Sequence, residues 1–234
     1  MKRSYEKEMM DLSVNSTDLL AGNLSDLRRL NRYLRGSRGV MLALQRAVGS
    51  EPLSHFSVLD VGTGSADIAA AIFAWAKRRN VAAKIVGVDT DSTTVRIAAS
   101  QTKLFAGINI VRGDAGGLPF APGAFDFVVA SQFLHHFSEV KIIELLKQWA
   151  QVARRAIVIS DLVRHPVAYH GIRLLTKLAT RNIMTLTDAP LSVRRAFSIS
   201  EWRELLRQAD IGPVEMIAVF PFRVAAVVRL GDGR

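Results

Sequence analysis

The fold of this chain is decided by the stretch SVLDVGTGSAD, which runs from Ser57 to Asp67. Residues suited to a buried strand lead into a sharp turn that contains Gly62 and Gly64, and an apolar helix over Ile68–Ala76 follows at once. A strand, turn and helix of this kind place backbone N–H groups at the carboxyl edge of a sheet, where open α/β folds bind nucleotides. We therefore expect a nucleotide-like ligand at this turn.

From Ser57 onward, short apolar strands alternate with helices, which indicates a parallel sheet with helices on both faces. The expected strands span residues 57–61, Lys84–Asp89, Ile108–Arg112, Phe125–Ser131, Ala156–Asp161, Val214–Val219 and Phe222–Leu230. The expected helices lie near residues 65–79, 92–101, 138–152 and 200–209, the last with Ser200 as its cap. The connection between the last two strands is too short for a parallel crossover, so we expect a hairpin there.

We divide the chain into a helical cap over residues 1–50 and a ligand-binding domain over residues 51–234. Residues 1–15 have the composition of a poorly ordered or loosely docked leader, and Ser25 is a good N-cap for a helix that ends at Gly36. A second amphipathic helix is expected over Arg38–Val48, stopped by Gly49 and Pro52. An insert over residues 162–197 is basic, with helical character around Ile172–Ala179 and an expected interruption at Pro190.

The composition excludes several classes of protein. The 234 residues contain no cysteine, so disulfides, zinc–thiolate sites and thiol nucleophiles are excluded, and a reducing, cytoplasmic location is expected. The basic amino terminus has no apolar core after it, so it does not predict a secretory signal. The longest apolar run, Ile68–Ala76, is far short of the roughly 20 residues that a membrane span requires.

The formal net charge is +10. Six arginines fall between Arg28 and Arg46, and six basic residues lie between Arg164 and Arg195 against the single acid Asp188. This charge suits RNA, an anionic membrane surface, an acidic substrate or simply a solvated surface. Each basic cluster contains one aromatic residue, Tyr33 or Tyr169, fewer than base stacking requires, so we do not expect a nucleic-acid partner.

The turn itself distinguishes between nucleotide ligands. A dinucleotide fingerprint needs glycine at position 67, where this chain has Asp67. A carboxylate at a helix start repels a pyrophosphate, and Asp60 adds a second negative group on the same side. Two carboxylates suit a cationic ligand without phosphate, which disfavours NAD and favours S-adenosylmethionine.

The pattern Asp60-x-Gly62-x-Gly64, followed by an acid at the end of the next strand, resembles the class I S-adenosylmethionine-dependent methyltransferases over residues 57–230. The resemblance implies a Rossmann-like, doubly wound, mostly parallel seven-stranded sheet of order 3-2-1-4-5-7-6 with an antiparallel last strand. It also implies an enzyme that uses S-adenosylmethionine. Ala66 stands where the family usually has glycine.

Further acids and strand ends extend the resemblance. Asp89 ends the second strand, where an acid accepts hydrogen bonds from both ribose hydroxyls, and Asp91 is the better candidate for a helix cap. In the family an acid at the position of Asp114 takes the adenine amino group, and the following N–H reaches a ring nitrogen; a solvated loop aspartate is the alternative. The expected cofactor-binding residues are Asp60, Gly62, Thr63, Gly64, Asp89, Thr90, Asp114, Ala115, Ser131 and Gln132.

The sequence Leu134-His135-His136 after the fourth strand resembles the small-molecule, UbiE-like branch, and the Asn/Asp-Pro-Pro-aromatic motif of amino-methyltransferases is absent. A histidine has the pKa to remove a phenol proton near neutral pH. Adjacent residues at a helix start point about 100° apart, so we expect His135 to face the substrate and His136 to pack beneath it. Asp161 ends the fifth strand and could orient a histidine or cap a loop. The alternative is that both histidines are structural.

No histidine–carboxylate cluster has metal-ligand spacing, so no metal is expected.

In this family the insert at 162–197 forms a substrate lid, and its many apolar residues suggest a hydrophobic pocket. We therefore expect O-methylation of a small phenolic, polyketide-type or quinol acceptor. C-methylation of a quinone precursor, RNA methylation and cofactor binding without turnover are the alternatives. We expect a monomer or homodimer, and peripheral membrane contact is left open.

Overall fold

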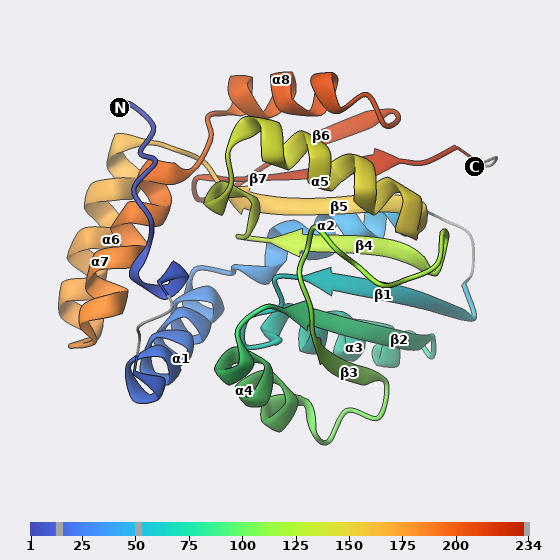
Figure 1. Cartoon of the computed structure of the whole chain (residues 1–234), viewed down its shortest axis with the longest axis horizontal. Helices are drawn as coiled ribbons and strands as arrows, with labels where there is room; N and C mark the ends of the chain where they lie inside the picture. Colours follow the sequence, from blue (N-terminus) through green and yellow to red (C-terminus); the bar gives the residue numbers. More distant parts are fainter. Residues whose placement is uncertain (13–15, 50–52, 232–234) are drawn as a thin grey trace.

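The computed structural model describes residues 1–12, 16–49 and 53–231, and its centre is a seven-stranded sheet (Figure 1). The strands are β1 (His55–Val61), β2 (Ala82–Asp89), β3 (Ile108–Arg112), β4 (Phe125–Ser131), β5 (Ala153–Leu162), β6 (Val214–Val219) and β7 (Arg223–Arg229). Their order, β3-β2-β1-β4-β5-β7-β6, confirms the predicted order. β7 runs antiparallel to both β5 and β6, so the predicted carboxyl-terminal hairpin is also confirmed.

Helices cover both faces of the sheet (Figure 1). On one face α5 (Glu139–Val152) and α8 (Ile199–Ala209) bury Trp149 and Trp202 in a core that includes residues of β4, β5 and β7. On the other face lie α2 (Ser37–Val48), α3 (Asp67–Arg78) and α4 (Ser92–Thr102). The two layers hold the sheet so that the carboxyl ends of its parallel strands meet at one edge.

Helix α2 belongs to the sheet layer. Its apolar residues recur every three or four positions and pack against β5 and β7. The buried members of this face are Val40, Ala43, Leu44 and Ala47. The division expected between residues 50 and 51, and the stop expected at Pro52, lie outside the described residues. The part of the expected cap that lies over the sheet edge is therefore the segment before α2.

Two helix starts differ from the prediction. Helix α1 (Thr17–Tyr33) begins after Ser16, whose Oγ accepts a hydrogen bond from the N–H of Leu19, so the predicted start at Ser25 is wrong. Ser25 is an exposed residue within the helix. Helix α8 is capped by Ser198 and not by the predicted Ser200, because Ser198 and Glu201 form a reciprocal capping box.

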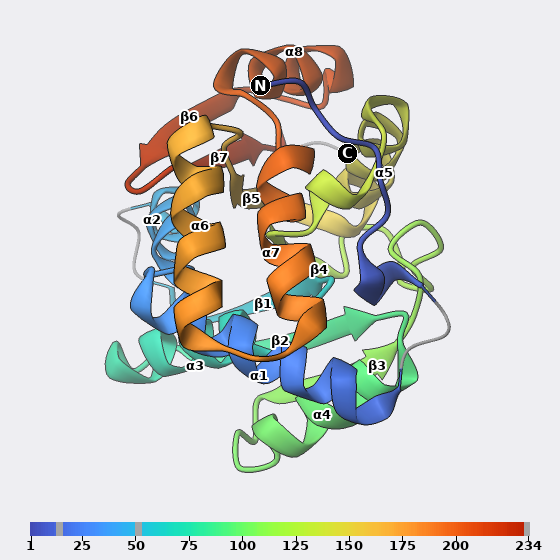
Figure 2. The ribbon, with the colours of Figure 1, turned by 90° about the vertical axis from the view of Figure 1, so that its left-hand side faces the viewer.

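The insert forms two helices, α6 (Pro166–Ala179) and α7 (Ile183–Arg195), which stand side by side at the carboxyl edge of the sheet (Figure 2). The predicted interruption at Pro190 is wrong, because α7 continues through this residue. Proline removes one helical hydrogen bond. Here its neighbours Ala189 and Leu191 are buried, and this packing holds the helix on both sides of the proline.

Residues 1–12 lie along α7 and end in a short 3-10 helix, η1 (Met9–Asp11) (Figure 2). The N–H of Ser4 donates to the carbonyl of Arg194, and the side chains of Ser4 and Glu8 are buried. The prediction of a loosely docked leader is therefore wrong for these residues. The contacts that hold them join positions more than 130 residues apart, which no local pattern reveals.

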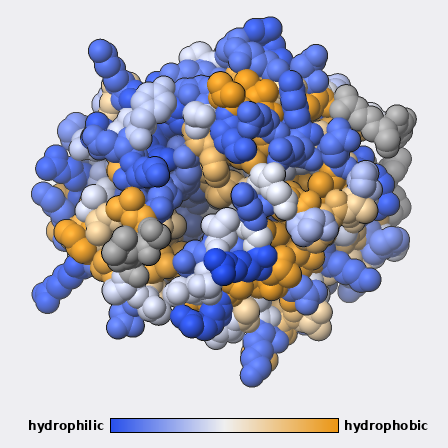
Figure 3. All heavy atoms as spheres, in the orientation of Figure 1, coloured by the Kyte–Doolittle hydropathy of each residue, from blue (hydrophilic) through white to orange (hydrophobic). Residues whose placement is uncertain are grey.

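Hydrophilic side chains cover most of the face shown in Figure 3, and hydrophobic residues occur there as separate patches. This distribution fits a chain with 22% charged residues. Within the described part of the chain, every helix is too short or too polar to cross a bilayer.

Candidate cofactor and acceptor site

The turn between β1 and α3 depends on glycine at one position in particular. Gly62 has φ of +68°, and a side chain there would clash with the ring of Phe133. Thr63 follows with its Oγ1 donating to Oδ2 of Asp60 at 2.7 Å. Ala66 adopts φ of +58°, a left-handed conformation that glycine adopts more easily. The turn is thus tight, and its backbone comes close to the edge of the sheet.

Three carboxylates gather around this turn. Burial, together with the negative charges of Asp67 and Asp89, raises the pKa of Asp60 to about 7 against the hydrogen bond from Thr63. Burial also raises the pKa of Asp67 and of Asp89. An acidic pocket of this kind is more stable when a positively charged ligand enters it. The residues therefore fit a cationic nucleoside and do not fit a pyrophosphate.

Asp89 and Asp91 have different roles, one at the glycine turn and the other as a helix cap. The Oδ2 of Asp89 accepts from the N–H of Gly64 at 3.1 Å, so it ties the β2 end to the glycine turn. Asp91 caps α4 by accepting from the N–H of Thr94 at 2.7 Å, which confirms it as the cap. Asp114 is exposed at the surface of the loop, where its Oδ1 accepts from the N–H of Gly116. Its contact with adenine stays a prediction.

All ten expected cofactor residues line one cavity of about 960 Å³ at the carboxyl edge of the sheet. His135 and His136 line the same cavity, whereas Asp161 lies behind His135. The outer walls are mostly apolar and come from α1, the residue that follows it and α6, although Arg28 and Asn31 of α1 also line the cavity. The aliphatic residues on these walls are Leu20, Leu24, Leu27, Leu30, Leu34, Val167, Ile172 and Leu175.

The histidines lie on a second 3-10 helix, η2 (Leu134–His136). His135 is 2% exposed, and its Nδ1 lies 2.7 Å from Oδ1 of Asp161. Its Nε2 is buried without a hydrogen-bond partner among the described residues. Burial raises the pKa of the Asp161 carboxyl, but the charge and hydrogen bond of His135 outweigh it and hold that pKa below its usual value.

The expected divergence of the two imidazoles is wrong. Their rings stack with centroids 4.5 Å apart and planes 30° apart, and both face the cavity. His136 is the more exposed of the two, so it does not pack beneath His135. The reason is that separate carboxylates hold the rings: Asp161 holds His135, and Asp11 accepts from Nδ1 of His136 at 3.0 Å.

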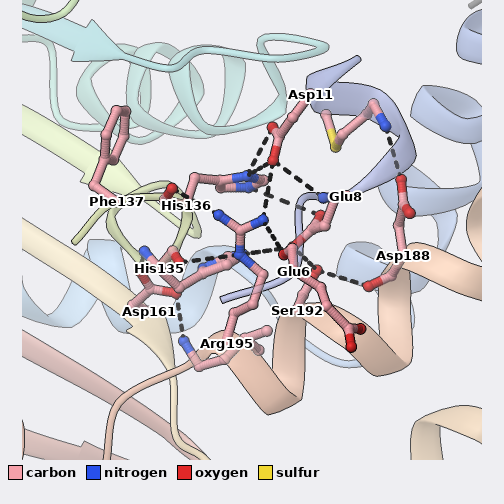
Figure 4. A network of polar contacts seen from close by, with 12 residues as sticks. Glu6, Glu8, Asp11, His135, His136, Phe137, Asp161, Asp188, Ser192 and Arg195 are labelled. Atoms are coloured by element: carbon pink, nitrogen blue, oxygen red, sulfur yellow. Dashed lines mark hydrogen bonds and ion pairs between the residues drawn. The ribbon is translucent and has the colours of Figure 1, made fainter. Parts of the chain in front are cut away.

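The amino-terminal segment adds groups that were not predicted from the sequence (Figure 4). Glu8 is 1% exposed and lies 3.7 Å from Nε2 of His135 and 3.9 Å from Nε2 of His136. Burial disfavours the cation of His136, but the charges of Glu8 and Asp11 outweigh it and raise the pKa of His136 above its ordinary value. The acids at positions 6, 8 and 11 were the only available signal, and nothing in their spacing links them to the histidines.

Two arginines hold η2 in place. Arg195 donates to the carbonyls of His135 and His136 and pairs with Asp11 at 3.1 Å. Arg3 donates to the carbonyls of His135 and Phe137 and pairs with Glu139 at 2.8 Å. Because both guanidinium groups bind η2 directly, residues 1–12 and α7 position the imidazoles together.

Comparison with known proteins agrees with this geometry. Residues 58–156 match the family model described as a methyltransferase domain. This match supports a class I methyltransferase domain over residues 58–156. The cofactor of this class is S-adenosylmethionine, and the acidic glycine turn fits it.

Individual relatives support the same class. The chain is 28% identical over 160 residues to the uncharacterized methyltransferase YcgJ of Bacillus subtilis, covering 67% of this chain and 57% of that protein. It is 26% identical over 127 residues to the demethylmenaquinone methyltransferase of Staphylococcus carnosus, covering 54% and 49%. The chain thus spans about half the length of the curated relatives it matches. A SAM-dependent methyltransferase from Aquifex aeolicus shares the fold, with a TM-score of 0.63, 17% identity and coverage of 89% of this chain and 98% of that one.

Proposed function

We propose that this protein transfers the methyl group of S-adenosylmethionine to an oxygen of a small hydrophobic acceptor, either a phenolic, polyketide-type compound or a quinol. The observation that carries the proposal is one cavity that joins an acidic glycine turn to a buried His135–Asp161 pair and an apolar outer wall. Pockets with apolar walls and a few fixed polar groups are typical of small-molecule sites.

S-adenosylmethionine, when bound, supplies a methyl group on a positively charged sulfur. We assign Asp89 to the ribose hydroxyls, and Asp114 with the N–H of Ala115 to the adenine. The end of β4, at Ser131 and Gln132, lies beside the turn and is assigned to the methionine part. The remaining cofactor assignments are Asp60, Gly62, Thr63, Gly64 and Thr90.

His135 is the proposed base. A carboxylate only accepts hydrogen bonds, so the Nδ1 that faces Asp161 carries the imidazole proton and leaves Nε2 free to accept one. Asp161 and the backbone contacts of Arg195 keep this orientation. We propose that His136 and Asp11 hold the second wall of the acceptor site and exclude water from it.

Calorimetric titration with S-adenosylhomocysteine tests the cofactor site. We expect binding by the intact protein and at least tenfold weaker binding by Asp89→Ala, since a charge-assisted hydrogen bond contributes about 1.5–3 kcal/mol. Failure of the intact protein to bind either S-adenosylmethionine or S-adenosylhomocysteine would refute the proposal. Incubation of a cell extract with isotope-labelled cofactor, followed by mass analysis, identifies the acceptor.

The base is tested on that acceptor with His135→Ala. A positioned general base contributes roughly 10²–10⁴-fold to the rate. At each pH from 6 to 9, kcat of the variant is therefore expected to be at least 10²-fold below that of the unaltered protein. An unchanged kcat would remove His135 from this role and leave proximity as the source of the rate.

C-methylation of a quinone precursor is the second candidate, supported by the similarity to a demethylmenaquinone methyltransferase. NMR of the labelled product distinguishes a methyl group on carbon from one on oxygen.

We also propose a cytoplasmic location and contact with an anionic membrane surface through α6, whose outer face combines apolar and basic residues.

A further inference from the structure

We propose that Glu8, His135 and His136 form a binding site for one divalent transition-metal ion on the wall of the cavity. Each side chain offers one ligand atom, and the three atoms lie within 4.8 Å of one another. Two imidazoles and one carboxylate are a set that binds zinc and related ions. No sequence pattern predicts this site, because Glu8 lies 127 residues before His135 and reaches it through the docked amino-terminal segment.

The separations between the ligand atoms fit a shared ion better than direct hydrogen bonds. Glu8 lies 3.7 Å and 3.9 Å from the two Nε2 atoms, beyond the 3.2 Å that a good hydrogen bond allows. Two ligands at about 2.1 Å from one ion lie roughly 3.4 Å apart at a tetrahedral angle and at most about 4.2 Å apart. The 3.7 Å and 3.9 Å separations join different oxygens of Glu8, and the three ligand atoms lie within 4.8 Å of one another, so an ion between these groups would draw them in by up to about 1.4 Å.

The second ring nitrogens are held as metal-binding histidines require. Nδ1 of His135 faces Asp161 at 2.7 Å, and Nδ1 of His136 faces Asp11 at 3.0 Å. Each carboxylate accepts the Nδ1 proton and so directs the lone pair of Nε2 toward Glu8. Carboxylate–histidine pairs of this kind orient the imidazole and increase its basicity toward a metal.

Burial and charge support an ion at the same point. Glu8 and His135 are at least 98% buried, and Nε2 of His135 has no hydrogen-bond partner in the described part of the chain. Within ion-pair distance of the histidines lie three carboxylates, those of Glu8, Asp11 and Asp161, and Arg195 pairs with the first two of them. A divalent cation bound at the two Nε2 atoms would place positive charge among these carboxylates.

The site deepens the proposed function, on which its catalytic role rests. All three ligands line the cavity, so the open coordination positions of the ion would face the acceptor. An acceptor hydroxyl that binds the ion loses its proton to solvent, and its oxygen forms the bond to the methyl carbon as the sulfur–methyl bond breaks. In the ion-bound form Nε2 of His135 is a ligand, and the ion replaces it as the group that activates the oxygen.

The test uses the full chain, stripped with a chelator and then dialysed against Zn²⁺, Co²⁺ or Mg²⁺. We expect about one Zn²⁺ or Co²⁺ per chain by elemental analysis, with a Co²⁺ absorption spectrum typical of nitrogen and oxygen ligands. Mg²⁺ prefers oxygen ligands and is expected to be lost on dialysis. A chain that retains no stoichiometric Zn²⁺ or Co²⁺ overturns the proposal.

Variants identify the ligands. Glu8→Gln and His136→Gln are expected to weaken Zn²⁺ binding at least tenfold, whereas His170→Ala, which removes an exposed imidazole outside the cavity, should bind as the unaltered chain does. Circular dichroism and S-adenosylhomocysteine binding check that each variant is folded. If both ligand variants keep full affinity, the site is refuted, whatever the outcome for methyl transfer. If Zn²⁺ binds but cofactor does not, the proposed function fails and the ion site stands.

Discussion

At the scale of single residues, the glycine turn makes a prediction that separates a steric clash from backbone strain. Gly62 and Gly64 both have positive φ, but only at Gly62 would a side chain meet a ring, that of Phe133. A left-handed conformation costs an ordinary residue roughly 1–2 kcal/mol, and overpacking typically costs a further 1–3 kcal/mol. Gly62→Ala is therefore expected to lower the free energy of unfolding by about 2–5 kcal/mol, and Gly64→Ala by about 1–2 kcal/mol. Urea unfolding measures both, and equal losses would contradict the clash.

The carboxyl of Asp60 makes the stability of the ligand-free protein depend on pH. Its pKa of about 7 exceeds the ordinary value of 3.8, so the native state holds a proton that the unfolded chain releases. The free energy of unfolding is therefore expected to fall as the pH rises from about 4 to 7 and to stay low above pH 7. This group contributes at most about 4 kcal/mol to the fall. Asp60→Asn removes this contribution at every pH.

The measurement is urea unfolding of both proteins between pH 5 and pH 8 without cofactor. The slope of stability against pH should be smaller in Asp60→Asn, and at pH 8 the variant should be the more stable protein while binding cofactor more weakly. Burial also raises the pKa of Asp67 and Asp89, so some slope remains in the variant. Parallel curves for the two proteins would show that Asp60 is not responsible.

At the scale of single elements, the cap of α8 can be tested with two neighbouring serines. Ser198 Oγ accepts from the N–H of Glu201, whereas the hydroxyl of Ser200 contacts only that of Ser198. Ser198→Ala is expected to reduce the free energy of unfolding by about 1 kcal/mol, and Ser200→Ala by a few tenths. Thermal or urea unfolding compares them, and a larger loss at Ser200 would restore the start predicted from the sequence.

Comparison of helix α8 with the strands shows why strands were easier to predict than helix ends. β3 and β4 match the predicted residues without a shift, because each is rich in β-branched or aromatic residues and is bounded by polar or turn-forming residues. Several serines near a helix start satisfy the rule for an N-cap equally well, and the choice depends on which one faces the core. Pro190 shows the same limit, since burial of its neighbours keeps α7 continuous.

The candidate site also contains residues that local sequence patterns predict and residues that only distant contacts bring together. The cofactor edge could be predicted because strand ends and turns bring its residues together by topology alone. Glu8, Asp11 and Arg195 could not be predicted, because they meet η2 through tertiary contacts. The ion pair between Arg195 and Asp11 spans 184 residues, and no periodicity or motif connects its two ends.

At the scale of the whole molecule, part of the net charge of +10 lies where apolar side chains are exposed. Along α6 and at the start of α7, Val167, Leu174, Leu178 and Ile183 are all more than half exposed. Between them lie the exposed basic residues Arg173, Lys177 and Arg181, and the sequence from 162 to 187 contains no acid. Ile172 and Leu175 of the same helix line the cavity, so a hydrophobic acceptor could enter from a membrane surface.

Sedimentation with lipid vesicles tests this surface. We expect binding to vesicles that contain phosphatidylglycerol, weaker binding to phosphatidylcholine alone, and loss of the difference at high salt. Lys177→Gln should weaken binding about fivefold, since one basic residue contributes about 1 kcal/mol, and Leu178→Ser should weaken it at least tenfold. Leu104→Ser is the matched control, because Leu104 is 93% exposed but precedes β3 at the opposite edge of the sheet. Equal losses in Leu104→Ser and Leu178→Ser, or salt-insensitive binding to both kinds of vesicle, would show that α6 does not dock on an anionic membrane.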